Sequence, residues 1–288
     1  MSYIYLLAAI IFSAMLSIMA AAFNNRNHIQ NISNLYNVIY MASSFFCWTV
    51  MYVFNFSFEP KVLLYSVAYG IFYTMALIGL FNAITCGSVS LTSFIKQLSF
   101  VGVAVWGFIF WRSPITLTVI VALFLIAISL FLCFKTKKNQ TDNSVSIKWL
   151  FYVSLLFIGN AGCSIVQKYQ QMAFGGKHGN MLMCFAVGFS MLLSTLFLLK
   201  NGIPHFSFLA KGSLKFPMFA GISSALVNLF ILLLATTTLS PTVIYPCIAV
   251  GGMILSILCS VIVYKEQLMK IQWIGLAIGI VAIVFLNI

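Results

Sequence analysis

Lys96 is the clearest candidate in this chain for a functional residue, because it lies inside the apolar stretch Val89–Phe110 with no acidic residue near it. The chain has three carboxylates, Glu59, Asp142 and Glu266, and each lies outside or at the end of an apolar run. A lysine at membrane depth costs roughly 3 kcal/mol unless it faces a partner, a water-filled cavity or an anionic ligand. We therefore expect Lys96 to bind a carboxylate or phosphate group in a cavity.

Further candidates for substrate binding are polar or aromatic side chains that also lie within apolar runs. With Lys96, the candidate set is Gln97, Trp48, Tyr73, Asn160, Asn228 and Tyr245. Polar groups at membrane depth must be hydrogen-bonded inside the protein or face water, so they indicate where a cavity lies. We expect the amides and Tyr245 to hydrogen-bond the polar groups of a ligand, and Trp48 and Tyr73 to cover its apolar part.

Several of these residues have an equally simple structural interpretation. Asn160 and Asn228 can join neighbouring helices by hydrogen bonds. Trp48 and Trp106 can be packing or interface residues. Near the ends of their apolar runs, long polar side chains such as Lys168 can extend to the membrane surface.

A helix break is expected beside Tyr245. Pro246 follows it directly, and Gly251 and Gly252 come soon after. Proline removes a backbone hydrogen bond and glycines loosen a helix, so backbone groups become available to a ligand or a hinge. An ordinary proline kink is the alternative.

Other kinds of chemistry find little support in the sequence. His28, His178 and His205 lie in separate loops, and the seven cysteines form no Cys-x-x-Cys pair or metal-binding pattern. There is no glycine-rich phosphate loop. No apolar run contains a carboxylate, which argues against cation/proton exchange built on such a group. We therefore expect no enzyme activity, no cofactor and no metal.

The composition predicts an α-helical integral membrane protein. Of the 288 residues, 62% are hydrophobic and 6% are charged, with the polar residues gathered between long apolar runs. The net charge of +12 comes from basic residues spread over the loops, where they anchor helix ends. A nucleic-acid partner is not expected, since no polar surface could carry a basic groove.

The apolar runs predict ten transmembrane helices. Their expected residues are 3–23, 33–55, 62–84, 88–111, 114–134, 148–169, 179–199, 214–235, 240–264 and 271–287.

The two halves of the chain are expected to be five-helix repeats, residues 1–134 and 148–288, joined by a polar linker at 135–147. A shift of 153 positions places Trp111-Arg112-Ser113 over Tyr264-Lys265-Glu266. Because each repeat would have an odd number of spans, the two would be inverted, as in many carriers. Chance similarity between hydrophobic helices is the alternative.

The end of the chain resembles a known signature. Within YKEQLMKIQWIGLAIGIVAI (264–283), Glu266 at a helix elbow, the run Gln272-Trp273-Ile274-Gly275 and Gly279 match the order and spacing found in EamA-type carriers. These carriers belong to the drug/metabolite transporter (DMT) superfamily. The first half departs from this signature at Ser113, where a glutamate is expected. The resemblance implies ten helices in two halves and transport as the activity.

These observations favour a secondary transporter, an exporter or importer of small metabolites that alternates access around a central cavity. The position of Lys96 points to anionic or zwitterionic substrates such as amino acids. A flippase for a lipid-linked precursor and a non-transporting membrane subunit remain alternatives. We expect a multi-pass protein of the inner (plasma) membrane, monomeric or homodimeric, in contact with the lipid bilayer. The coupling ion stays open between a proton and another ion.

The orientation of the termini also stays open. The resemblance implies cytoplasmic termini, whereas the count of lysines and arginines in the loops favours the reverse. A reporter fused to the C-terminus would distinguish the two.

Overall fold

The computed structural model of the chain describes residues 2–26, 32–86, 89–111, 116–133, 147–202, 212–264 and 269–286. The predicted elbows at Ser113 and Glu266 lie outside the described residues, as does the predicted linker apart from Ile147. The side chain of Gln97 also lies outside what the structure describes.

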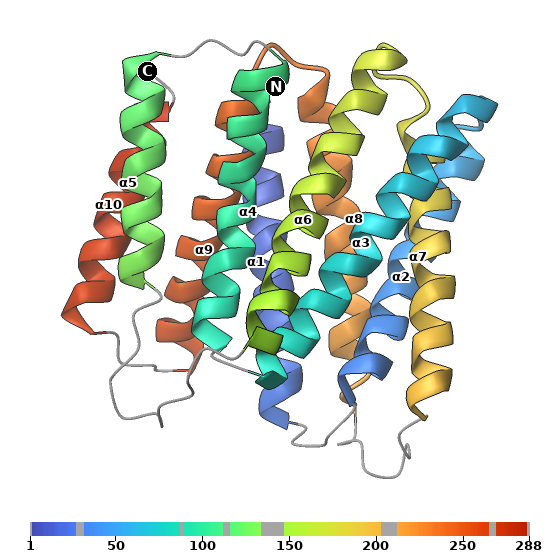
Figure 1. Cartoon of the computed structure of the whole chain (residues 1–288), viewed down its shortest axis with the longest axis horizontal. Coiled ribbons are helices and arrows are strands. Elements are labelled where there is room, and N and C mark those ends of the chain that lie inside the picture. Colours follow the sequence, from blue (N-terminus) through green and yellow to red (C-terminus); the bar gives the residue numbers. More distant parts are fainter. Residues whose placement is uncertain are drawn as a thin grey trace. The chain divides into compact units, whose positions relative to one another are not determined.

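Within the described residues the chain forms ten α-helices and no strand (Figure 1). The helices are α1 (Ser2–Arg26), α2 (Ile32–Phe54), α3 (Pro60–Cys86), α4 (Val89–Phe110), α5 (Leu117–Cys133), α6 (Ile147–Ala173), α7 (Gly179–Asn201), α8 (Lys215–Ala235), α9 (Pro241–Tyr264) and α10 (Lys270–Leu286).

The helices follow the apolar runs closely, and the largest difference is at the end of α6, predicted at residue 169 and observed at Ala173. The polar residues that suggested a loop there are part of the helix. Gln170 and Gln171 are both buried, and Gln170 Nε2 donates a hydrogen bond to the Lys177 carbonyl at 2.9 Å. Their amides satisfy groups inside the protein, so the helix continues through them.

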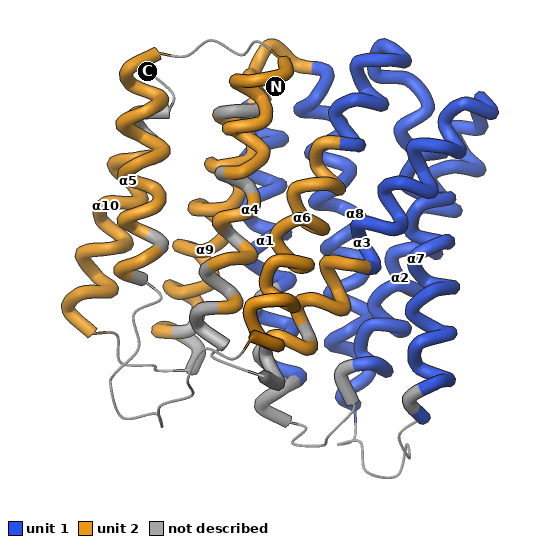
Figure 2. The backbone as a smooth tube through the Cα atoms, in the orientation of Figure 1, with its two compact units in different colours: residues 1, 3–74, 166–236 blue, residues 2, 75–165, 237–288 orange. Residues whose placement is uncertain are grey.

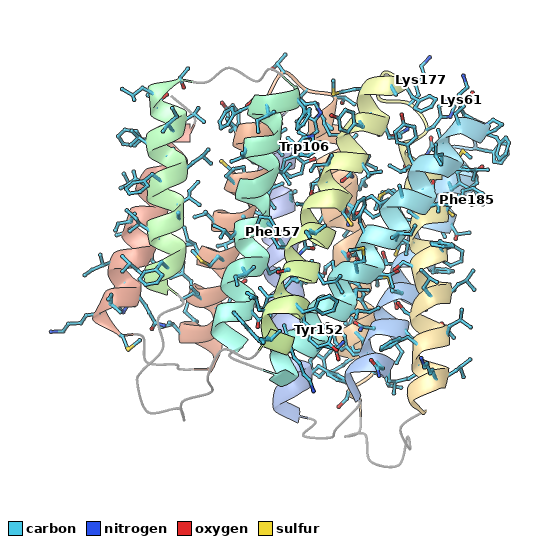
Figure 3. All side chains as sticks on the ribbon, viewed as in Figure 1. Lys61, Trp106, Tyr152, Phe157, Lys177 and Phe185 are labelled. Atoms are coloured by element: carbon cyan, nitrogen blue, oxygen red, sulfur yellow. The ribbon has the colours of Figure 1, made fainter. Side chains whose placement is uncertain are left out.

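In the part of the chain that the structure describes, six helices are long and apolar enough to cross a membrane. Their apolar segments are Ser2–Ala20, Asn34–Phe54, Pro60–Leu80, Ile147–Ala173, Gly179–Lys200 and Lys215–Ala235. Large apolar side chains such as Phe46, Leu64 and Phe185 stay exposed, as expected of surfaces that face lipid. Of these, Phe185 is labelled in Figure 3. The chain is therefore an all-α, multi-pass membrane protein.

The chain forms two compact units, shown in Figure 2. Unit 1 contains residues 3–74 and 166–236, and unit 2 contains residues 75–165 and 237–288. Helices α3 and α6 each begin in one unit and end in the other. Each unit therefore draws on both halves of the chain, while the division into sequence repeats at 1–134 and 148–288 stays a prediction.

In unit 1, α2 packs against both α7 and α8. Gly221 on α8 lies so close to α2 that a Cβ atom there would collide with the Tyr40 carbonyl oxygen and lie 2.8 Å from the Ser43 Cβ. Gly188 on α7 faces α2 in a similar way, with a Cβ at 2.8 Å from the Phe45 ring. Small residues allow this close approach of helices in lipid.

In unit 2, α5 packs along α10, and α4 packs against α9. The first part of α6 is held against α4 by Trp149, which is buried and donates from its indole Nε1 to the Thr92 Oγ1 at 3.2 Å. Gly79 on α3 also approaches α6, because a Cβ there would lie 2.7 Å from the Tyr152 carbonyl oxygen (Tyr152 is labelled in Figure 3). These contacts join α3, α4 and α6 within the unit.

The contact of α5 with α10 centres on Ser129. Its Oγ donates to the Gly275 carbonyl oxygen at 2.7 Å, and a Cβ added at Gly279, one turn further along α10, would lie 2.7 Å from the same Oγ. The four-residue spacing of these two glycines therefore lies at a close helix contact, as small residues spaced in this way predict.

We expect Gly279→Ala to destabilise the protein, because the added methyl group overpacks this contact at a cost of roughly 1–3 kcal/mol. Ser129→Ala alone should cost about 1 kcal/mol through the lost hydrogen bond. The double variant should lose less free energy of unfolding than the two single variants lose together, since the Ser129 Oγ that clashes with the added methyl group is gone. Thermal unfolding of the four proteins in detergent measures this coupling, and additive effects would contradict the contact.

Candidate functional site

Three hydroxyl groups meet inside unit 1, from Tyr40 on α2, Tyr73 on α3 and Ser224 on α8. The Tyr40 hydroxyl lies 2.8 Å from the Tyr73 hydroxyl and donates to the Ser224 Oγ at 2.6 Å. The third side of the triangle, from the Tyr73 hydroxyl to the Ser224 Oγ, is 3.1 Å. Ser224 is buried, and both tyrosines are half-buried. We call these three residues the hydroxyl cluster.

Hydrogen bonds connect the hydroxyl cluster to Asn228, one helical turn further along α8. The Asn228 Nδ2 donates to the Ser224 carbonyl at 2.9 Å, and its Oδ1 accepts a hydrogen bond from the Tyr69 hydroxyl at 3.1 Å. Its backbone carbonyl accepts from the Gln167 Nε2 of α6 at 3.4 Å. A polar network thus links four helices of unit 1.

The spacing of residues on α3 and α8 places these groups. Tyr69 and Tyr73 are four residues apart, as are Ser224 and Asn228, so each pair lies on one face of its helix. Gly221 lies on the same face of α8, one turn before Ser224. The close approach that it allows toward α2 brings the Tyr40 side chain within reach of α8.

The inner face of α2 carries two polar atoms without a partner among the described residues, Asn37 Oδ1 and Trp48 Nε1. Asn37 is 8% exposed and Trp48 is 0% exposed. The two residues are separated by about 16 Å along the helix at 1.5 Å per residue. Buried polar groups normally have a partner, so these two are candidates to contact a ligand.

Lys96 lies on α4 in unit 2 and is half-buried. The described residues of this unit contain no carboxylate, so they offer its ammonium group no ion pair. One turn earlier on α4, Thr92 accepts the hydrogen bond from Trp149 of α6. Lys96 therefore lies one helical turn beyond the residue of α4 that contacts α6.

Two further candidates in unit 2 are Asn160 on α6 and Tyr245 on α9. The hydroxyl of Tyr245, on α9, donates to the Ser164 carbonyl at 3.3 Å, one turn beyond Asn160. The Asn160 Nδ2 is buried and has no partner among the described residues. Helix α9 continues through Pro246, so this proline does not end the helix.

The structure thus groups the candidates in part. Tyr73 and Asn228 join one network through Ser224, and Tyr245 bonds to α6 at Ser164, one turn beyond Asn160. Trp48 is buried on α2, and Lys96 lies on α4. Their role in substrate binding stays a prediction.

Two side chains with structural interpretations make specific contacts. The Lys168 Nζ donates to the Ala235 carbonyl at 3.0 Å, at the end of α8, where a cation is favoured by the helix dipole. Trp106 stacks on Phe110 of the same helix with ring centroids 4.1 Å apart (Trp106 is labelled in Figure 3).

Sequence reasoning missed Tyr40, Ser224, Tyr69 and Asn37. Tyrosines and serines are common in membrane helices, so their type alone carries little information. The signal that could have found them is the i, i+4 spacing of Tyr69 with Tyr73 and of Ser224 with Asn228.

Comparison with known proteins shows the fold alone. No protein-family model matches the chain, and no curated protein matches its sequence. A solved structure described as "Crystal structure of protein" is similar, with a TM-score of 0.74 and 9% sequence identity. The match covers 99% of this chain and 96% of the other. The fold is therefore shared along nearly the whole length of both chains, and the substrate does not follow from it.

Proposed function

We propose that the protein is a secondary transporter of small anionic or zwitterionic metabolites, with amino acids as the leading class. The observation that carries the proposal is Lys96, a half-buried lysine in an apolar helix whose unit offers no carboxylate among the described residues. A carboxylate or phosphate of the substrate would supply the missing counter-charge.

All ten helices are proposed to cross the membrane, as two inverted five-helix repeats. Helix pairing supports this arrangement, because α2 packs on α7, α4 on α9 and α5 on α10. In each pair the partner stands five places later in the chain, as expected when equivalent helices of two repeats face each other across a pseudo-two-fold axis. The repeats would then be residues 1–134 and 148–288.

The proposal also includes a family and a membrane location for the protein. The segment 264–283 supports membership of the EamA-type carriers in the drug/metabolite transporter superfamily. The inner (plasma) membrane is the proposed location. Transport would be driven by a proton or another ion, or by the substrate gradient alone.

Transport is tested with purified protein in liposomes. Vesicles preloaded with an unlabelled amino acid mixture should accumulate labelled amino acid from outside, because a carrier exchanges substrate across the membrane without an energy source. Empty liposomes and liposomes that contain protein but no internal substrate are the controls. Failure to exchange any amino acid or small carboxylate would contradict the proposal. Movement of a labelled lipid-linked sugar instead would identify a flippase.

A further inference from the structure

The hydroxyl cluster of unit 1 has as many protons as it has mutual contacts. Three oxygen atoms lie 2.6–3.1 Å from one another, and each hydroxyl carries one proton. When every contact is a hydrogen bond, each hydroxyl donates once within the ring and accepts once. No proton then remains for a ligand acceptor, whereas the oxygen of a serine hydroxyl keeps a further lone pair. The cluster therefore favours a ligand that donates hydrogen bonds.

A second acceptor lies on the adjacent turn of α2. Asn37 is 8% exposed, and its Oδ1 has no partner among the described residues. Residues three apart are neighbours on a helix surface, so Asn37 and Tyr40 lie on the same side of α2. Long helical side chains lean toward the N-terminus, which directs the Tyr40 ring over the turn that holds Asn37. The buried amide oxygen is thus a further acceptor on the side of α2 that carries Tyr40.

Among the described side chains, those beside Asn37 and the hydroxyl cluster are aromatic. The Tyr36 and Tyr40 rings stack with centroids 6.3 Å apart, and the Tyr69 and Tyr73 rings meet edge to face at 5.7 Å. Aromatic faces attract cations. Among the described residues, Glu59 precedes Tyr73 by 14 positions, about 20 Å of helix rise, and Lys215 precedes Ser224 by about 13 Å along α8. The Lys168 Nζ is held at the Ala235 carbonyl, about 16 Å beyond Ser224 along the same helix.

These properties match the ammonium group of a zwitterion, which has its counter-charge in the same molecule. An ammonium group has three N–H donors and no acceptor, which complements a surface of oxygen atoms and aromatic rings. A zwitterion carries a carboxylate of its own, so it needs no ionised side chain here. A free carboxylate would find no donor in the hydroxyl cluster.

We infer that Asn37 and the hydroxyl cluster of Tyr40, Tyr73 and Ser224 bind the ammonium group of a primary amine. The inference rests on the proposed function and specifies its substrate class, since it makes the substrate zwitterionic rather than anionic.

The test uses the full-length protein in detergent and three amino acids, L-alanine, L-leucine and L-phenylalanine. Each is compared with the acid that lacks its amino group and with the amine that lacks its carboxyl group. Binding is measured by calorimetry. We expect at least one amino acid to bind about 10-fold or more tightly than its deaminated acid.

The variants Tyr73→Phe and Asn37→Leu identify the surface. Each should weaken binding of that amino acid and of its amine, by about 10-fold, and leave binding of the acid unchanged. Asn37→Leu removes an amide oxygen without a partner, so it should fold even if Tyr73→Phe does not. Tyr65→Phe, also on α3, is the matched control and should change neither.

The outcomes separate this inference from the proposed function. Equal affinity for the amino acid and its acid, or an equal loss for both in Asn37→Leu, would overturn the inference while transport of acids in liposomes continued. Absence of binding for every amine and amino acid would overturn it as well. Absence of transport for all the acids and amino acids would overturn the proposed function itself.

Discussion

Replacement of Lys96 by methionine is expected to abolish transport while leaving the purified protein as stable as the wild type or more stable. Methionine is about as long as lysine and fills the same space in α4 without a charge. The substitution removes the desolvation cost of an ammonium group that has no carboxylate partner in the described part of unit 2. A hydrogen bond to a charged group contributes about 1.5–3 kcal/mol, so substrate affinity should fall roughly 10- to 100-fold.

The measurements for Lys96 are exchange in liposomes and thermal unfolding in detergent. Lys96→Ala should lose transport in the same way, with folding and membrane insertion intact. Lys148→Ala is the matched control, because Lys148 is an exposed lysine of the same unit, near the start of α6. Undiminished exchange in Lys96→Met or Lys96→Ala would rule out Lys96 as the residue that binds the substrate.

Gly221→Val is expected to give the largest loss of stability of any single change considered for unit 1. A side chain at this position must push the α8 backbone away from Tyr40 and Ser43 of α2. Overpacking of a close contact costs about 1–3 kcal/mol, and more where the obstacle is backbone that cannot rotate away. Gly221→Ala should have a smaller effect in the same direction.

Thermal unfolding in detergent checks this series, with Ile222→Val as the control because Ile222 is the next residue of α8 and its side chain is exposed. Separation of α2 and α8 would also lengthen the contact from Tyr40 to Ser224, so Gly221→Ala should weaken amine binding. A Gly221→Val protein with the stability of the wild type would show that the two helices are not in close contact.

Hydropathy was sufficient to predict the helices. In lipid the backbone must satisfy its own hydrogen bonds, so an apolar run of adequate length forms a helix whatever its neighbours are. The end of α6 differed because Gln170 and Gln171 are buried within unit 1, and local polarity does not distinguish a buried amide from a loop residue.

The candidate site was only partly predictable. Tyr73 and Asn228 stood out as polar residues in apolar runs, and the structure brings them into one network. Their partners Tyr40 and Ser224 did not, because tyrosine is common in membrane helices and a serine hydroxyl often bonds to its own backbone. Which hydroxyls turn toward each other depends on the packing of α2, α3 and α8.

The sequence by itself determined that this is a helical membrane protein, where its helices run, and that a lysine but no carboxylate lies within its apolar runs. These properties depend on residue type and local order. Only the tertiary structure decided that each unit combines helices from both halves of the chain, and that three hydroxyl groups meet in unit 1. The physical reason is that contacts such as Gly221 against α2 join residues far apart in the chain through shape, which no local pattern records.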